Sequence, residues 1–254
     1  IRRPPRSTQG VSSAASDVYK RQELSLSSLI KKNMLKKYWL FATSMIIISL
    51  ITVISFYIVL TPEKKLPIYQ PSMVKFQLVD STIQHVKRFH KIDDFSLVNQ
   101  NNEIITNETY DGKIYIADFF FTTCPGICPI MKENMIVLQD EFINDDDVLL
   151  LSHTVTPEID SVHVLKKYSQ DKGVIDSKWN MVTGDKKQIY NLARKSYLVA
   201  EDIEGPRQYD MIHTENFVLV DSKRRIRGFY DGTDNDVMDN LISDIKILKK
   251  EEFE

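Results

Sequence analysis

The chain has few cysteines and few glycines, and these shortages exclude several classes of protein. Its 254 residues include only two cysteines, too few for a framework of several disulfides. Eight glycines, with no GxGxxG pattern and no P-loop, argue against a glycine-rich nucleotide-binding loop. A net charge of −2 gives no support for a nucleic-acid partner, and there is no internal repeat. The remaining composition, 43% hydrophobic and 27% charged, is that of a globular domain.

The two cysteines lie where a buried strand is predicted to run into a helix. Residues 114–121 are nearly all apolar or aromatic, which predicts a strand buried on both faces. Apolar residues recur at helical spacing over residues 130–142, and Pro129 is tolerated only in the first turn of that helix. Cys128 is therefore predicted near the N-cap and Cys124 just outside it.

Two thiols at the start of a helix have special chemistry. The free N–H groups and the dipole of the helix favour the thiolate, which is both the nucleophile and the metal-binding form of cysteine. The spacing lets the two sulfurs bind one soft ion or form a disulfide. A structural disulfide is the alternative, but closing so short a loop restricts the unfolded chain little. The pattern favours a reactive or metal-binding pair, Cys124 and Cys128.

A second buried strand is predicted over residues 148–155. Thr156 follows it as the expected cap of a helix, with Pro157 at the first position and Asp160 in the first turn. His153 lies on this strand near the cysteines, and we interpret it as a core residue rather than as a second layer around a metal site.

A membrane anchor is predicted near the N-terminus. Residues 38–60 carry no charge, and this run is long enough for a helix to span a bilayer. Lysines concentrate just before it, which predicts that the N-terminus lies in the cytoplasm or matrix and the rest outside. A cleaved signal peptide is the alternative. The apolar run is long for one and no small-residue cleavage pattern follows, so an uncleaved anchor is favoured.

The segments around this span differ in character. Residues 1–37 are predicted to be a disordered tail, in which residues 1–22 resemble translated adaptor sequence. Residues 61–90, with three prolines, are predicted to be a linker. Residues 91–254 contain strands that alternate with amphipathic helices, plus two hairpins. This pattern predicts an α/β domain with a mixed sheet flanked by helices.

The cysteine segment and its surroundings resemble one family. The copper-binding signature of the Sco/SenC family, in which CxxxC replaces the CxxC of thioredoxin, is similar to FFFTTCPGICPIM. Three further segments of that family resemble FSLVNQNNEIIT, TVTPEID and YDMIHTENFVLVD, so the resemblance covers about residues 92–248. It implies a thioredoxin-like fold and a copper site formed by Cys124, Cys128 and His213. Thiolates suit Cu(I), and an added imidazole also accommodates Cu(II).

Two positions depart from the family pattern. Members often carry Asp where this chain has Thr156, and they often carry Asp directly before the ligand histidine, where this chain has Ile212. Neither position supplies a metal ligand in the family. The departures therefore concern the tuning of the site and the docking of a partner.

Two functions compete for the same thiols. The resemblance implies a membrane-anchored copper chaperone, not an enzyme, that delivers copper to the binuclear copper site of cytochrome c oxidase subunit II. The alternative is a thiol–disulfide oxidoreductase in which Cys124 and Cys128 are the redox-active pair. Such a reductase normally shows CxxC and needs no histidine, so His213 favours copper. The predicted location is the bacterial inner membrane with the domain in the periplasm, and the mitochondrial inner membrane is the alternative.

Overall fold

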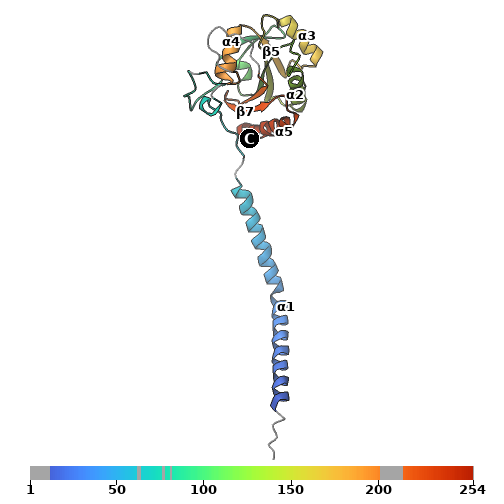
Figure 1. The fold of residues 1–254 in the computed structure, drawn as a ribbon. Helices are drawn as coiled ribbons and strands as arrows, with labels where there is room; N and C mark the ends of the chain where they lie inside the picture. The colour runs from blue at the N-terminus through green and yellow to red at the C-terminus, as the bar shows by residue number, and fades with distance from the viewer. Residues whose placement is uncertain (1–11, 62–63, 76–77, 81, 201–213, 254) are drawn as a thin grey trace, which may run out of the picture. The chain divides into compact units, whose positions relative to one another are not determined.

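The computed structural model describes residues 12–61, 64–75, 78–80, 82–200 and 214–253 (Figure 1). The chain divides into two compact units, residues 1–63 and residues 64–254. Among the described residues, all strands belong to the second unit.

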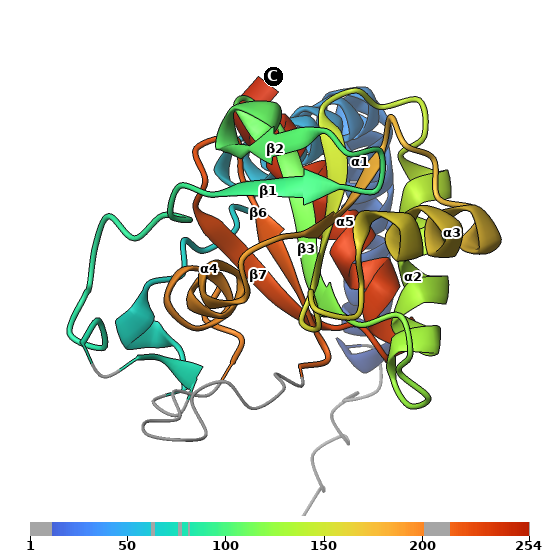
Figure 2. The same ribbon diagram turned by 90° about the horizontal axis from the view of Figure 1, so that it is seen from above.

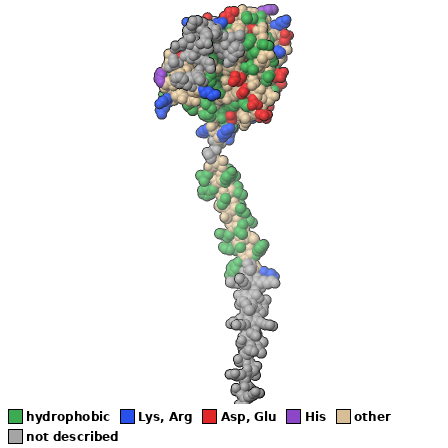
Figure 3. Space-filling model, in the orientation of Figure 1, with side chains coloured by type: hydrophobic (Ala, Val, Ile, Leu, Met, Phe, Trp, Pro, Cys, Tyr) green, Lys and Arg blue, Asp and Glu red, His purple; other side chains and the backbone are tan. Residues whose placement is uncertain are grey.

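In the first unit, the described residues form a long helix, α1 (Ser12–Leu60). Its segment Lys36–Leu60 contains a stretch of 18 residues with a mean hydropathy of 2.4, and the segment is long enough to cross a membrane. Apolar side chains are exposed along this segment (Figure 3). The sequence predicted disorder up to residue 37, whereas the helix begins at Ser12. Neither Gly nor Pro occurs over residues 12–37, so no residue there breaks the helix.

The second unit is built on a mixed sheet of seven described strands, in the order β2-β1-β5-β4-β3-β6-β7 (Figure 2). The strands are β1 (Ser96–Asn99), β2 (Ile104–Thr106), β3 (Ile114–Phe120), β4 (Val148–Thr154), β5 (Trp179–Thr183), β6 (Asn216–Val220) and β7 (Ile226–Asp231). β3, β4 and β5 run parallel to one another, and the other neighbours are antiparallel. Both predicted hairpins, β1 with β2 and β6 with β7, are present. The predicted α/β fold is confirmed.

Helices cover both faces of this sheet (Figure 2). One face carries α2 (Cys128–Glu141), α3 (Val162–Lys172) and α5 (Asn235–Phe253). The other face carries α4 (Lys186–Asn191), the π-helical turn η4 (Leu192–Ser196) and the segment that leads into β1. The described helical elements also include the 3₁₀ turns η1 (Pro71–Met73) and η3 (Asn107–Tyr110).

β3 is central to the sheet, and all its residues are buried. Side chains alternate between the two faces of a strand. Residues 115, 117 and 119 accordingly belong to the core beneath α4, and residues 114, 116 and 120 to the core beneath α2. Asp118 is the charged residue of this apolar strand, and the alternation places it on the α2 side.

The start of α3 differs from the prediction. The helix begins at Val162 with Ser161 as its N-cap residue, whereas the sequence suggested a cap at Thr156. Asp160 was expected to interact with the first turn. Its carboxylate instead accepts hydrogen bonds from threonine hydroxyls, so it stabilises the loop before the helix rather than the helix itself.

The segment predicted as a linker also differs. The prediction covered residues 61–90, but the second compact unit begins at Lys64. Leu66 and Val79 are buried in this unit, at 6% and 1% exposure. Much of the segment therefore packs as part of the domain, because its apolar side chains are buried in the two hydrophobic cores.

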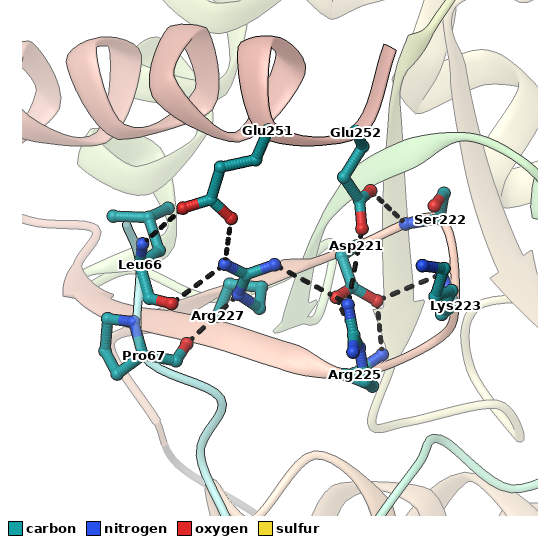
Figure 4. A network of polar contacts seen from close by, with 9 residues as sticks. All are labelled: Leu66, Pro67, Asp221, Ser222, Lys223, Arg225, Arg227, Glu251 and Glu252. Atoms are coloured by element: carbon teal, nitrogen blue, oxygen red, sulfur yellow. Dashed lines mark hydrogen bonds and ion pairs between the residues drawn. The ribbon is translucent and has the colours of Figure 1, made fainter. Parts of the chain in front are cut away.

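A network of polar contacts, here called the clamp, ties this segment to the domain (Figure 4). The guanidinium of Arg227 donates to the carbonyl oxygens of Leu66 at 2.8 Å and of Pro67 at 3.1 Å. It also pairs with the carboxylates of Asp221, at 3.2 Å, and Glu251. The backbone N–H of Leu66 donates to Glu251 at 2.7 Å. The clamp therefore joins the start of the domain to β7 and to the last turn of α5.

Candidate metal centre

The two cysteines lie in the turn that joins β3 to α2. Cys124 is in the turn and is partly exposed, whereas Cys128 is the first residue of α2 and is buried. Pro129 follows in the first turn of the helix, where its missing N–H leaves no backbone hydrogen bond unmade. Both thiols are free. The pair therefore lies at a strand-to-helix junction, as the sequence predicted.

The two thiols have pKa values that differ in direction. Burial acts to raise the pKa of Cys124, but the Cys128 thiol and the backbone N–H groups of Cys128, Gly126 and Ile127 donate hydrogen bonds to its sulfur, and the pKa is lowered overall. Burial raises the pKa of Cys128 to about 12, and its hydrogen bond to Cys124 acts in the same direction. Cys124 is therefore the first of the two to form a thiolate.

A buried carboxylate from the neighbouring loop holds the cysteine turn. Asp160 accepts a hydrogen bond from the backbone N–H of Thr122 at 3.2 Å and another from the Thr122 hydroxyl. The hydroxyls of Thr154 and Thr156 also donate to Asp160, the latter at 3.0 Å. The loop between β4 and α3 therefore fixes the backbone just before Cys124. From the sequence, Asp160 was expected in the first turn of a helix, and its contact with the cysteine turn was not predicted.

A cluster of buried polar groups lies on the α2 side of the sheet. Asp118 accepts a hydrogen bond from the Ser152 hydroxyl, which in turn accepts one from the indole N–H of Trp179 at 2.8 Å. The ammonium of Lys132 lies 4.0 Å from the centroid of the Trp179 ring. Burial raises the pKa of Asp118 and lowers the pKa of Lys132 to about 7. The cluster comprises Asp118, Lys132, Ser152 and Trp179.

Asp118 and Lys132 were not predicted as part of the site, although the sequence contains a signal for each of them. Asp118 is a charge inside an otherwise apolar strand, and such a residue needs a buried partner. Lys132 follows Cys128 by four residues, which places both side chains on one face of α2. Neither signal alone identifies the partner, because the contacts depend on which strand lies beside β3.

His153 lies on the opposite face of the sheet, in the core beneath α4. Its ring stacks on Phe119 with centroids 4.8 Å apart and meets Tyr197 edge-on at 5.3 Å. Burial lowers the pKa of His153 to about 4, so the imidazole is neutral at pH 7. Its Nε2 has no hydrogen-bond partner among the described residues. This burial agrees with the interpretation of His153 as a core residue.

The third predicted ligand, His213, lies outside the described residues, as does Ile212. The described chain resumes at Thr214, directly before β6. β6 pairs antiparallel with β3, with Val218 opposite Ala117, so β6 begins at the end of the sheet where β3 finishes. In the part of the chain that the structure describes, no group of three or more metal-binding side chains occurs. The described part supplies two soft sulfur donors.

A mixed sheet whose central strand ends in a cysteine pair at a helix start is the arrangement of a thioredoxin-like protein. The family model for SCO1/SenC matches residues 83–249 of this chain. The chain therefore belongs to the SCO1/SenC family.

Relatives in this family are similar in sequence and in fold. The SCO1 protein homolog of Bacillus subtilis (strain 168) is 32% identical over 160 residues, which are 62% of this chain and 82% of the relative. A Stutzerimonas stutzeri protein whose name describes copper binding is 29% identical over 148 residues, 56% of this chain and 69% of the relative.

Two solved structures share the fold. BsSco, described as having a disulfide switch and as a member of the Sco family of cytochrome c oxidase assembly proteins, gives a TM-score of 0.54 at 30% identity. The match covers 63% of this chain and 93% of BsSco. A SCO1/SenC family lipoprotein from Bacillus anthracis str. Ames gives 0.56 at 28% identity, over 63% of this chain and 95% of the lipoprotein.

Proposed function

We propose that this chain is a copper chaperone that delivers copper to the binuclear copper site of cytochrome c oxidase subunit II. Its family supports this function, because one relative is named for copper binding and another is described as an oxidase assembly protein. The observation that carries the proposal is the pair of free thiols at the start of α2, in which hydrogen bonds lower the pKa of Cys124.

The proposed ligands are Cys124, Cys128 and His213. Two thiolates, one in the turn before α2 and one at the first residue of α2, bind one soft ion, and Cu(I) prefers thiolate sulfur. The imidazole of His213 adds a donor that Cu(II) also accepts, so one site holds either oxidation state. The position of Thr214, at the end of the sheet where the cysteine turn lies, supports His213 as the third ligand.

The proposed organisation is a transmembrane anchor at residues 38–60 followed by an exported Sco domain. The lysines before the anchor favour an N-terminus on the inner side, and the lipoprotein relative is consistent with export. The bacterial inner membrane, with the domain in the periplasm, is the proposed location. A reporter fused after Glu254 should then behave as an exported protein, and cytoplasmic reporter activity would contradict this topology.

Thiol–disulfide oxidoreduction is a second candidate function, because the two thiols differ in exposure and in pKa. The Cys124 thiolate would attack a substrate disulfide and release one substrate thiolate, forming a mixed disulfide. Cys128, after losing its proton, would then attack the Cys124 sulfur and release the second substrate thiolate. The product is a Cys124–Cys128 disulfide and a reduced substrate.

Copper binding by the full chain in detergent tests the chaperone function. Replacing both Cys124 and Cys128 by Ser should abolish tight Cu(I) binding. His213→Ala should weaken Cu(II) binding more than Cu(I) binding, because imidazole matters more to the harder ion. Copper retained in full by the double cysteine variant would overturn the assignment of the site.

Complementation of oxidase activity separates the two functions. In a strain that lacks the protein, His213→Ala should fail to restore oxidase activity at limiting copper and should recover partly when copper is in excess. The thiols remain intact in this variant, so a reductase would still work. Full restoration at limiting copper would therefore leave the reductase function and remove the chaperone function.

A further inference from the structure

The core beneath α2 contains a buried ammonium group, that of Lys132. Lys132 is 4% exposed, and its Nζ has no hydrogen-bond partner among the described residues. Three aromatic rings surround it: the centroids of Trp179, Phe120 and Tyr168 lie 4.0, 4.8 and 5.4 Å from Nζ. The faces of aromatic rings stabilise a cation where water is excluded. We call these three rings the aromatic cage.

The buried ammonium of Lys132 does not contribute to the stability of the fold in a way that would explain its presence. Removing a charge from water opposes folding, and an apolar side chain of similar size would occupy the same space without that penalty. The position of Lys132 points to another role. It follows Cys128 by one helical turn on the same face of α2, and negative charge on Cys128 and on Asp118 stabilises its charged form.

Copper binding changes the charge beside Lys132. Two thiols that bind Cu(I) release two protons, so the two thiolates and the ion together carry a net charge of minus one. Cys128 is 6% exposed, and a buried anion needs a compensating charge. Asp118 lies on the same side of the sheet and opposes the ionisation of Cys128. A cation at Lys132 offsets both.

We propose that Lys132 is a positioning residue for the copper centre, whose caged ammonium balances the negative charge that Cys124 and Cys128 acquire when they bind Cu(I). This inference rests on the proposed function, because it takes the two cysteines as the copper ligands. Lys132 acts through its charge and is not itself a ligand. The same charge favours the reduced pair over the disulfide, because a thiolate is negative and a disulfide is neutral.

Two substitutions remove the charge. Lys132→Leu leaves an apolar side chain, and Lys132→Gln leaves an uncharged polar one. Methionine is avoided because its thioether would itself bind Cu(I). Lys172→Leu is the matched control: the Lys172 ammonium also lies over the Tyr168 ring, at 5.7 Å from the centroid, but Lys172 is exposed.

The full chain in detergent is measured in competition with a chromophoric Cu(I) chelator. The Lys132 variants should bind Cu(I) about tenfold more weakly than the parent chain, and the control should be unchanged. Without metal, equilibration with glutathione buffers gives the reduction potential of the Cys124–Cys128 pair. That potential should become more negative in both Lys132 variants and stay constant in Lys172→Leu.

Thermal unfolding of the metal-free proteins tests the structural alternative. Replacing a buried charge by leucine is neutral or stabilising, so Lys132→Leu should unfold at the same or a higher temperature. A folded Lys132 variant that matches the control in Cu(I) affinity and in reduction potential would overturn the proposal. If the variant with both cysteines replaced by Ser still binds Cu(I) as tightly as the parent chain, the proposed function fails. The reduction potential of the cysteine pair, measured without metal, still tests the role of Lys132.

Discussion

At the end of the sheet where β3 begins, Arg227 is buried against two carboxylates and two carbonyl oxygens. In the core beneath α2, Lys132 is buried against three aromatic rings, one of which belongs to Phe120 at the end of β3. The strand register separates the two places: Val220 pairs with Tyr115 early in β3, and Asp221 follows, whereas the cysteine turn comes after Phe120. The same domain therefore stabilises buried positive charge in two ways, with carboxylates and carbonyl oxygens around Arg227 and with aromatic rings around Lys132.

The clamp serves the stability of the domain, whereas the surroundings of Lys132 serve the proposed copper site. Every charged group of the clamp has a partner of opposite charge, so the clamp holds the start of the chain and the end of α5 in one arrangement. The cysteine end contains Lys132 and His153, whose nitrogens Nζ and Nε2 lack hydrogen-bond partners among the described residues. These two nitrogens do not fix the positions of neighbouring groups through hydrogen bonds. A new charge close to them changes their pKa values and therefore their protonation.

The largest expected effect is on copper and comes from the cysteine end. Cys124→Ser leaves one thiolate and should lower Cu(I) affinity by about a thousandfold or more, because the chelate is lost. The free energy of unfolding should change by less than about 1 kcal/mol, since Cys124 is partly exposed. Chelator competition and urea unfolding of the full chain measure the two quantities. A large loss of stability in Cys124→Ser would contradict the view that the cysteine pair serves copper binding and not the stability of the domain.

Breaking the clamp should have the converse effect. Arg227→Met leaves the carboxylate of Glu251 without its ion-pair partner and leaves Asp221 paired with Arg225 alone. Breaking a buried ion pair destabilises a protein by about 3–5 kcal/mol. Cu(I) affinity should stay at the parent value, because the clamp lies at the other end of β3. Urea unfolding measures the first effect. A marked fall in the copper affinity of the folded variant would show that the two ends are coupled.

Acid should destabilise the cysteine end through His153. Burial lowers its pKa to about 4 in the folded chain, below the ordinary value of 6.5. Between these two pH values the unfolded chain therefore binds more protons than the folded chain. The contribution of neutral His153 to the free energy of unfolding is complete above pH 6.5 and is lost as the pH falls towards 4. The contribution is roughly 3 kcal/mol, at about 1.4 kcal/mol per pKa unit.

His153→Phe keeps an aromatic ring against Phe119 and removes the proton-binding site. The stability of this variant, measured by urea unfolding at several pH values, should fall less steeply between pH 6.5 and 4 than that of the parent chain. Parallel curves for the two proteins would show that His153 is not the source of the acid sensitivity.

An exposed ion pair should show the smallest effect and serves as the control for the clamp. Lys246 pairs with Glu141 at 2.6 Å, but its side chain is 60% exposed. Lys246→Gln should change the free energy of unfolding by about 0.2–1 kcal/mol, because water and salt screen the pair. If this loss equalled that of Arg227→Met, burial would not be what distinguishes the clamp.

Much of the local structure follows from the sequence. The apolar run of β3, both hairpins and the start of α2 at the cysteine pair were predicted from residue pattern and are confirmed. These features depend on neighbours along the chain, through hydrophobic period and through the backbone limits of Pro129. His213 as a ligand and the anchor at residues 38–60 remain predictions.

The sequence by itself determined which residues of the strands and of α2 face a core and where the two thiols meet a helix, because these are local properties of hydrophobic period and of the backbone limits of Pro129. Only the tertiary structure decided what surrounds the thiols. Ser152 meets Asp118 because β4 pairs with β3 in that register, and Trp179 joins them because β5 lies beside β4. Arg227 reaches Leu66 because β7 and the first residues of the domain meet at one end of the sheet. A residue pattern records the face of each element but not its neighbours, and buried charges are stabilised by neighbours.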